Sequence, residues 1–190
     1  MRPTFKLFAR YPTPGAAKTR LIPALGADGA AGLHRELTER TLTLLIATGC
    51  PVEVHYTGAG TAAFESWLGA VTLVPQSDGE LGDRLTAALG QGPCLFFGAD
   101  TPDLTAAHVE AAIAVLADHD VAIGPAEDGG YWAIGMKTPR PELFQGIDWG
   151  SDRVFAQTMA RAEGLRVSLL ETLADCDRPE DLARWPWLTA

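Results

Sequence analysis

Short apolar runs alternate with longer amphipathic stretches along almost the whole chain. Residues 4–9, TFKLFA, form an apolar run that ends in a cluster of prolines and a glycine, which is typical of a buried strand entering a loop. Residues 28–48 follow, rich in alanine, leucine and glutamate, with leucines near helical spacing. The first part of the chain therefore predicts a strand, a loop and a helix in that order.

The same alternation continues to the end of the chain. Strands are predicted at 52–56, 71–74, 94–97, 121–123 and 131–136, with a last apolar run at 165–170. Helices are predicted at 62–68, 81–89, 105–117 and 151–163, and Thr105 is an expected N-cap. This order predicts an α/β fold with a mostly parallel sheet covered on both faces. With no repeat, linker or low-complexity tract, we expect a single domain over residues 1–190.

The composition and net charge of the chain limit the classes of molecule that it is expected to bind. The chain is 47% hydrophobic and carries 15 Lys and Arg against 24 Asp and Glu, a net charge of −9. Such a surface repels nucleic acid and anionic membranes, so neither is an expected partner. We find no signal peptide and no apolar stretch of the roughly 18 residues that a membrane span needs. Three cysteines without a CxxC pair fit reduced thiols, so we expect a cytoplasmic protein.

Cations cluster in the loop after the first predicted strand, RYPTPGAAKTRL. Arg10, Lys18 and Arg20 stand near the turn at Gly15. Such a loop lets backbone N–H groups and cationic side chains approach a phosphate together. A solvated basic loop is the alternative on composition alone, and the GxxxxGK[ST] phosphate-binding motif is absent.

A carboxylate follows a strongly apolar strand in the segment FFGADTPDL. Ligands of open parallel sheets gather beyond the carboxyl ends of the strands, which is where Asp100 falls. Mg²⁺ and Mn²⁺ prefer oxygen ligands and often need only one or two protein carboxylates beside phosphate oxygens. Asp100 is therefore a candidate metal ligand, whereas Asp103 is better explained as a helix cap or turn former.

Three further segments carry candidate contacts. In EDGGYW the glycines fit a hairpin turn, and Asp128 and Tyr131 are candidates for contacting a substrate. In QSDGELGDR, Gln76 and Gly79 could contact a nucleobase through an amide and a close backbone approach. In the acidic segment DCDRPEDL, Asp177 is the expected N-cap of a short helix, a role compatible with metal binding.

The remaining candidates point to structure rather than chemistry. The four histidines share no metal spacing and are expected on the surface or on helix faces. No GxSxG or HExxH motif is present. Trp185 and Trp187 either pack on the domain or mark a dimer contact, so a homodimer is an open alternative.

Several of these motifs together resemble the nucleotide-diphospho-sugar transferase superfamily over nearly the full chain. They are AAKTRLIPALG, QxxGxLGxR, the GAD after an apolar strand, DGGY and DCDRPEDL. The set is most similar to an uncharacterised glycosyltransferase-like branch, the first loop resembles the KxRL loop of 2-phospholactate guanylyltransferases, and the last segment resembles CMP-sugar synthetases. The resemblance implies a glycosyltransferase A type fold, a Rossmann-like three-layer α/β/α sandwich with the nucleotide over its N-terminal half and the acceptor over its C-terminal half.

The resemblance also implies roles for residues by position. Lys18 and Arg20 match phosphate-contacting residues, and Asp100 and Asp177 match ligands of Mg²⁺ or Mn²⁺. The segment with Gln76 and Gly79 falls where nucleobase-contacting loops often lie. The chain departs from the pattern in two places: PTPG stands where sugar nucleotidyltransferases have consecutive glycines, and no DxD surrounds Asp100.

The implied activity is that of a metal-dependent transferase with a nucleotide donor and a small-molecule acceptor. The leading expectation is nucleotidyl transfer from a nucleoside triphosphate to a phosphorylated or hydroxyl acceptor, because cations near the phosphates would stabilise a leaving pyrophosphate. Lys18, Arg20 and Asp128 are the expected catalytic residues, with Arg10 and Gly15 completing the nucleotide-binding loop. Glycosyl transfer from a nucleotide sugar and a non-catalytic nucleotide-binding module are the alternatives.

Overall fold

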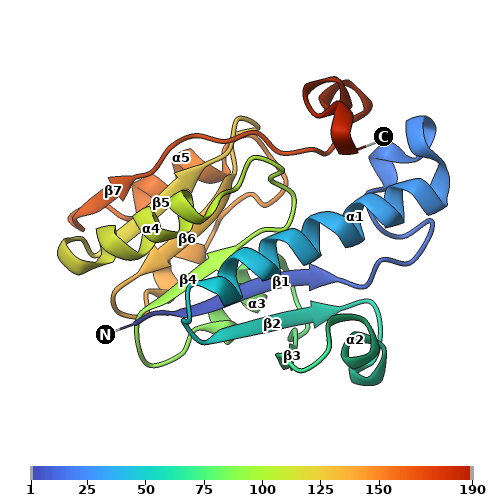
Figure 1. The fold of residues 1–190 in the computed structure, drawn as a ribbon. Coiled ribbons are helices and arrows are strands. Elements are labelled where there is room, and N and C mark those ends of the chain that lie inside the picture. The colour runs from blue at the N-terminus through green and yellow to red at the C-terminus, as the bar shows by residue number, and fades with distance from the viewer. Residues whose placement is uncertain (1, 189–190) are drawn as a thin grey trace.

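The computed structural model of the chain describes residues 2–188, which form a seven-stranded sheet in the order β3-β2-β1-β4-β6-β5-β7 (Figure 1). The strands are β1 (Thr4–Arg10), β2 (Val52–Thr57), β3 (Thr72–Pro75), β4 (Cys94–Phe97), β5 (Val121–Pro125), β6 (Tyr131–Met136) and β7 (Val167–Leu169). β6 runs antiparallel to both of its neighbours, and every other pairing is parallel. The predicted mostly parallel sheet is confirmed.

Helices cover both faces of this sheet, as expected for an α/β sandwich. They are α1 (Ile22–Ala47), α2 (Thr61–Leu68), α3 (Leu81–Ala88), α4 (Ala106–Asp118) and α5 (Val154–Arg161). Short 3₁₀ helices are η1 (Thr19–Leu21), η2 (Pro141–Phe144), η3 (Pro179–Arg184) and η4 (Pro186–Leu188). The four apolar residues of β4 show the reason for two covered layers, because Leu95 and Phe97 pack on the α1 and α4 side while Cys94 and Phe96 pack on the opposite side.

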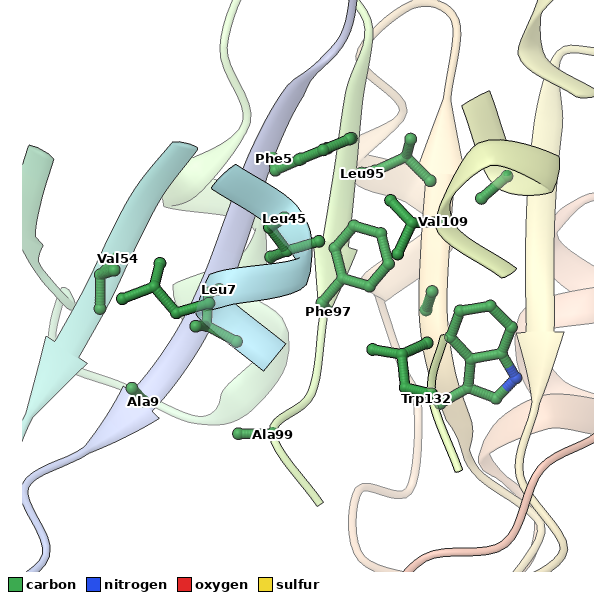
Figure 2. Close-up of a cluster of buried hydrophobic side chains, with 14 of the residues drawn as sticks. Phe5, Leu7, Ala9, Leu45, Val54, Leu95, Phe97, Ala99, Val109 and Trp132 are labelled. Carbon is green, nitrogen blue, oxygen red and sulfur yellow. The ribbon is translucent and has the colours of Figure 1, made fainter. Parts of the chain in front are cut away.

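The larger core lies between the sheet and the pair α1 and α4 (Figure 2). Phe5 and Phe97, from neighbouring strands, meet edge to face with ring centroids 5.4 Å apart. Leu45 of α1 and Val109 of α4 are fully buried against this layer. Each large side chain buried in this way contributes about 1.5–3 kcal/mol to folding. This burial stabilises the sheet that positions the loops of the site.

Helix boundaries differ most from the sequence prediction at two starts. α1 begins at Ile22 rather than 28, because its first turn precedes a break at Gly26, where φ is 72°. α5 begins at Val154 rather than 151, after a turn in which the Ser151 hydroxyl donates to the Asp148 carbonyl. The start of α4 agrees with the prediction, since Thr105 caps it.

The C-terminal segment returns across the molecule from β7 to the start of α1 (Figure 1). On the way, the Cys176 N–H donates to the Asp100 carbonyl at 2.9 Å. Trp185 is buried against Leu37 of α1, so packing explains it, while Trp187 remains 42% exposed. This return path brings residues near position 177 beside the loop that follows β1.

Two negative expectations can be compared with the structure. Among residues 2–188, no helix is both long and apolar enough to cross a bilayer. All three cysteines are buried and unpaired with one another.

The histidine prediction is wrong for one of the four residues. His34 is only 8% exposed but lies on a face of helix α1 as expected, whereas His55 is 4% exposed and lies on a strand. His55 lies on β2 in a buried polar cluster, where both its Nε2 and the Lys6 ammonium contact Glu53 Oε2, at 2.9 and 2.6 Å. Glu53 lies two residues before His55 on the same strand and therefore on the same face, so its carboxylate supplies the polar partner that buried groups need.

This cluster predicts a loss of stability in acid. Burial holds the pKa of His55 below its ordinary value of 6.5, although the hydrogen bond to Glu53 opposes the shift. The unfolded chain therefore takes up the proton first as pH falls, and the free energy of unfolding decreases through this range. Urea unfolding of the wild type and His55→Gln at about pH 7.5 and 5.5 measures it, and the variant should lose less stability. Equal losses in both proteins would contradict the assignment.

Candidate functional site

The carboxyl ends of six strands meet at one edge of the sheet, since only β6 runs the other way. The loop after β1, with Lys18 and Arg20, lies beside the loop after β4, with Asp100, because these two strands are neighbours. The turn with Asp128 follows β5 at the same edge. The segment after β7 then crosses these loops and adds Asp177.

Lys18 is the centre of this arrangement. Its backbone lies in the left-handed region, with φ 43° and ψ 49°, which costs a residue with a Cβ on the order of 1 kcal/mol. The side chain is only 4% exposed, and its ammonium lies 2.7 Å from Asp100 Oδ1 and 3.1 Å from Asp177 Oδ1. It also donates to the Cys176 carbonyl at 2.7 Å. One cation thus ties three segments of the chain together.

The charges of this group support one another. Burial alone would lower the pKa of Lys18, but the carboxylates of Asp100 and Asp177 raise it above its ordinary value. Burial alone would raise the pKa of Asp100, and the Lys18 ammonium instead holds it below its ordinary value. Lys18 is therefore an ammonium and Asp100 a carboxylate at neutral pH.

Asp177 does not cap the short helix that follows it, so that prediction is wrong. The cap position of η3 is Arg178, and the Asp181 carboxylate accepts hydrogen bonds from the N–H groups of Asp177 and Arg178 at 2.9 and 2.7 Å. The Asp177 side chain turns instead to Lys18 and to Arg20, whose Nη1 lies 3.3 Å from Oδ2. The Asp177 carboxylate therefore points into the candidate site and not toward the N-terminus of η3.

Asp175 joins the site, although the sequence interpretation gave it no role. Its Oδ1 accepts a hydrogen bond from the Thr101 hydroxyl at 2.9 Å. Burial raises the pKa of Asp175 to about 7, the negative charges of Asp100, Asp128 and Asp177 act in the same direction, and the bond from Thr101 opposes them. Asp175 therefore differs from Asp100, whose pKa is held below its ordinary value by the Lys18 ammonium.

Two adjoining cavities open at this edge. The smaller, of about 320 Å³, is lined by the first loop, by His34 of α1 and by Asp100. The larger, of about 560 Å³, lies over Asp128, Tyr131 and Trp149. Both are lined by Arg20 and Asp177, so the two cavities adjoin at these residues.

The nucleotide-binding candidates divide between these cavities and the rest of the edge. Arg10 lines the smaller cavity, and its carbonyl accepts a hydrogen bond from His34 Nε2 at 2.9 Å. Gly15 adopts φ 81° in the turn of the same loop. Gln76 and Gly79 line neither cavity. The Gln76 amide is engaged by the His55 carbonyl and by an arginine, so the structure does not bring these two residues to the others.

The turn between β5 and β6 confirms the hairpin interpretation of the glycines. Gly129 has φ 90°, and a Cβ there would lie 2.2 Å from the Asp152 carbonyl oxygen, so only glycine fits. Asp128 Oδ1 accepts a hydrogen bond from the Gly130 N–H at 2.9 Å. The exposed Asp128 carboxylate faces the larger cavity beside Tyr131, with Trp149 on its wall.

The donor set at Asp100 and Asp177 fits a Mg²⁺ or Mn²⁺ ion held mainly by phosphate oxygens. Both carboxylates already reach one cation, the Lys18 ammonium, within 3.1 Å. Within residues 2–188 no three His, Cys, Asp or Glu side chains gather as metal ligands. A magnesium site of this kind uses one or two protein carboxylates, with water and phosphate completing the shell.

This fold and site define a nucleotide-diphospho-sugar transferase class of protein. A crystal structure from Desulfovibrio desulfuricans G20, provisionally described as a nucleotide-diphospho-sugar transferase, matches with a TM-score of 0.88 and 32% identity, covering 93% of this chain and 82% of that one. The chain belongs to the family described as uncharacterized protein conserved in bacteria (DUF2064), whose model matches residues 41–151. The superfamily recognised from the sequence motifs and the glycosyltransferase A type fold are confirmed.

More distant structures share the fold. The CTP complex of CMP:2-keto-3-deoxy-manno-octonic acid synthetase matches with a TM-score of 0.62 and 12% identity, over all of this chain and 98% of that one. The manganese complex of Rv0371c from Mycobacterium tuberculosis H37Rv matches with a TM-score of 0.60 and 15% identity, over 97% of each chain. No curated protein matches this chain. The expectation of a transferase enzyme agrees with these neighbours.

Proposed function

We propose that the chain is a metal-dependent nucleotidyltransferase, which transfers a nucleotidyl group from a nucleoside triphosphate to a hydroxyl or phosphate of a small acceptor. The observation that carries this proposal is the convergence of Lys18, Arg20, Asp100 and Asp177 where two cavities adjoin. Phosphoryl chemistry needs charge neutralisation and positioning more than a covalent intermediate, and this group supplies both.

The reaction balances as a single displacement. An oxygen of the acceptor forms a bond to the α-phosphorus, and the bond between that phosphorus and the pyrophosphate oxygen breaks. Arg20, 64% exposed at the junction of the cavities, stabilises the charge of the pyrophosphate as it leaves. A hydroxyl acceptor gives its proton to Asp128, which faces the larger cavity. When bound by Asp100 and Asp177, Mg²⁺ would supply charge neutralisation at the phosphate oxygens.

The structural neighbours support a nucleotide donor. The synthetase with the same fold binds CTP, and the Rv0371c structure with the same fold binds manganese. In this chain the smaller cavity, beside the cationic loop, suits the phosphates, and the larger cavity suits the acceptor.

Glycosyl transfer from a nucleotide sugar is the second candidate. It is favoured by the description of the relative with 32% identity as a nucleotide-diphospho-sugar transferase. It is also favoured by Asp128, since a carboxylate over the larger cavity could orient or deprotonate a sugar hydroxyl.

Thermal unfolding with a panel of donors separates the candidates. Each nucleoside triphosphate and nucleotide sugar is added with Mg²⁺, with Mn²⁺ and with chelator. A ligand at 100 times its Kd adds about 2.7 kcal/mol, or about 5–10 °C for a domain of this size. We expect one triphosphate to raise Tm only when metal is present. A preference for a nucleotide sugar would select glycosyl transfer, and no response to any donor would contradict both candidates.

A further inference from the structure

The Lys18 ammonium is already occupied by protein oxygens in this structure. An ammonium has three N–H donors, and Lys18 donates two hydrogen bonds and forms an ion pair with a third oxygen, all within 3.1 Å. Those oxygens are the Cys176 carbonyl, Asp100 Oδ1 and Asp177 Oδ1. The side chain is only 4% exposed, so little of it is open to a ligand in the smaller cavity. A phosphate can bind Lys18 only if at least one of these partners is released.

The same ammonium stands between the two carboxylates that suit a divalent cation. A divalent cation bound by the same two carboxylates would lie close to the ammonium, and Coulomb repulsion between the two cations opposes its binding. The protein therefore carries its own cation between the two candidate ligands, and a metal ion must compete with it.

We propose that Lys18 is an internal counter-cation. Its ammonium keeps Asp100 and Asp177 from binding a divalent metal until a polyphosphate draws the ammonium away. This inference rests on the proposed function, because it assumes that the same carboxylates serve a nucleotide reaction. Its consequence is that metal and polyphosphate bind together, each weakly without the other.

The geometry explains how Lys18 can change partners. Its backbone lies in the left-handed region, which costs free energy for a residue with a Cβ, so a change of partners that moves the loop out of this conformation would recover that cost. Arg20, on the other oxygen of Asp177, is 64% exposed and can move with the phosphate at little cost. The smaller cavity offers the space, since Lys18, Arg20 and Asp177 all line it.

Binding of Mn²⁺ to the full chain tests the proposal without any assay of turnover. Equilibrium dialysis at matched free Mn²⁺ compares the wild type with Lys18→Met. The control is Lys137→Met, an exposed lysine that donates to the Ala117 carbonyl. We expect Lys18→Met to bind Mn²⁺ about tenfold more tightly than the wild type or the control. Adding Asp100→Asn to Lys18→Met should abolish this gain, which would assign the gain to the carboxylate pair.

A second experiment uses the wild-type protein, because Lys18→Met leaves three oxygens without their cationic partner and the variant could fail to fold. Inorganic tripolyphosphate should raise the Mn²⁺ affinity of the wild type by about tenfold, again at matched free Mn²⁺. The inference is overturned if folded Lys18→Met gains no affinity, or if tripolyphosphate leaves the wild-type affinity unchanged. A gain in Mn²⁺ affinity together with no response to any nucleotide donor would preserve the inference and reject the proposed function.

Discussion

Replacing Asp100 with asparagine is expected to abolish the metal-dependent stabilisation of the protein by its nucleotide donor. Asparagine keeps the shape of the side chain but removes the charge that a divalent cation needs, and it replaces the ion pair with Lys18 at 2.7 Å by a contact to a neutral amide. Loss of outer-shell partners of a metal typically costs 10–100-fold in affinity, so we expect loss of a direct ligand to cost at least about 100-fold. Titration calorimetry with the donor, with Mg²⁺ and with chelator, measures it.

Asp103→Asn is the matched control for this prediction. Asp103 lies in the same loop, three residues further on, but is exposed in a turn and takes no part in the ion pairs of Lys18. Its replacement should leave donor affinity within about twofold, since surface changes away from specific contacts have small effects. Equal losses in the two variants would contradict the assignment of Asp100.

Replacing Asp128 with asparagine is expected to reduce kcat by about 10²–10⁴-fold with a hydroxyl acceptor and to leave donor affinity unchanged. The amide oxygen of asparagine can still accept the hydrogen bond from the Gly130 N–H, so the turn survives while the carboxylate is lost. Pyrophosphate release, measured with the donor identified by thermal unfolding, gives kcat, and titration calorimetry gives the affinity.

Asp128→Ala separates the turn from the chemistry. Alanine removes both the charge and the hydrogen bond to Gly130, so any further loss in Asp128→Ala belongs to the turn. Unchanged turnover in Asp128→Asn would rule out a role for this carboxylate in proton transfer or in orienting the acceptor.

The order of strands and helices could be predicted because each element carries its own periodicity. β4 and β6 have the predicted bounds, since apolar runs between turn residues mark a strand buried on both faces. The start of α1 was misplaced because Gly26 interrupts the pattern while the chain is already helical before it. Local signals determine where elements lie but describe breaks within them poorly.

The composition of the site was predictable, and its connections were not. Lys18, Asp100 and Asp177 each follow a recognisable motif, but the ammonium that joins them makes contacts across as many as 159 positions of sequence. The prediction for the cap of η3 was wrong because two carboxylates lie near the start of this helix: Asp177 precedes it and Asp181 lies in its first turn. The pattern does not say which of the two accepts hydrogen bonds from the backbone. Only the tertiary fold decides between them.

Asp175 was missed although a signal for it exists. In an extended segment, residues two apart face the same side, so Asp175 and Asp177 form a pair toward one surface. The segment that holds them is not helical, and it forms a parallel bridge with Ala126 at Leu173. Applied to DCDRPEDL, this rule would have added Asp175 to the candidates.

The return of the C-terminal segment to α1 has a consequence for the order of assembly. Contacts between residues far apart in sequence require closure of a long loop and therefore form late. A nascent chain could assemble strands β1 through β6 before Asp177 has been made. Lys18 would then lack the Asp177 carboxylate and the Cys176 carbonyl. The Asp177 carboxylate thus reaches the loop after β1 only after all seven strands have been made. The site can therefore bind its ligand only once the C-terminal segment has been synthesised and has packed on the sheet.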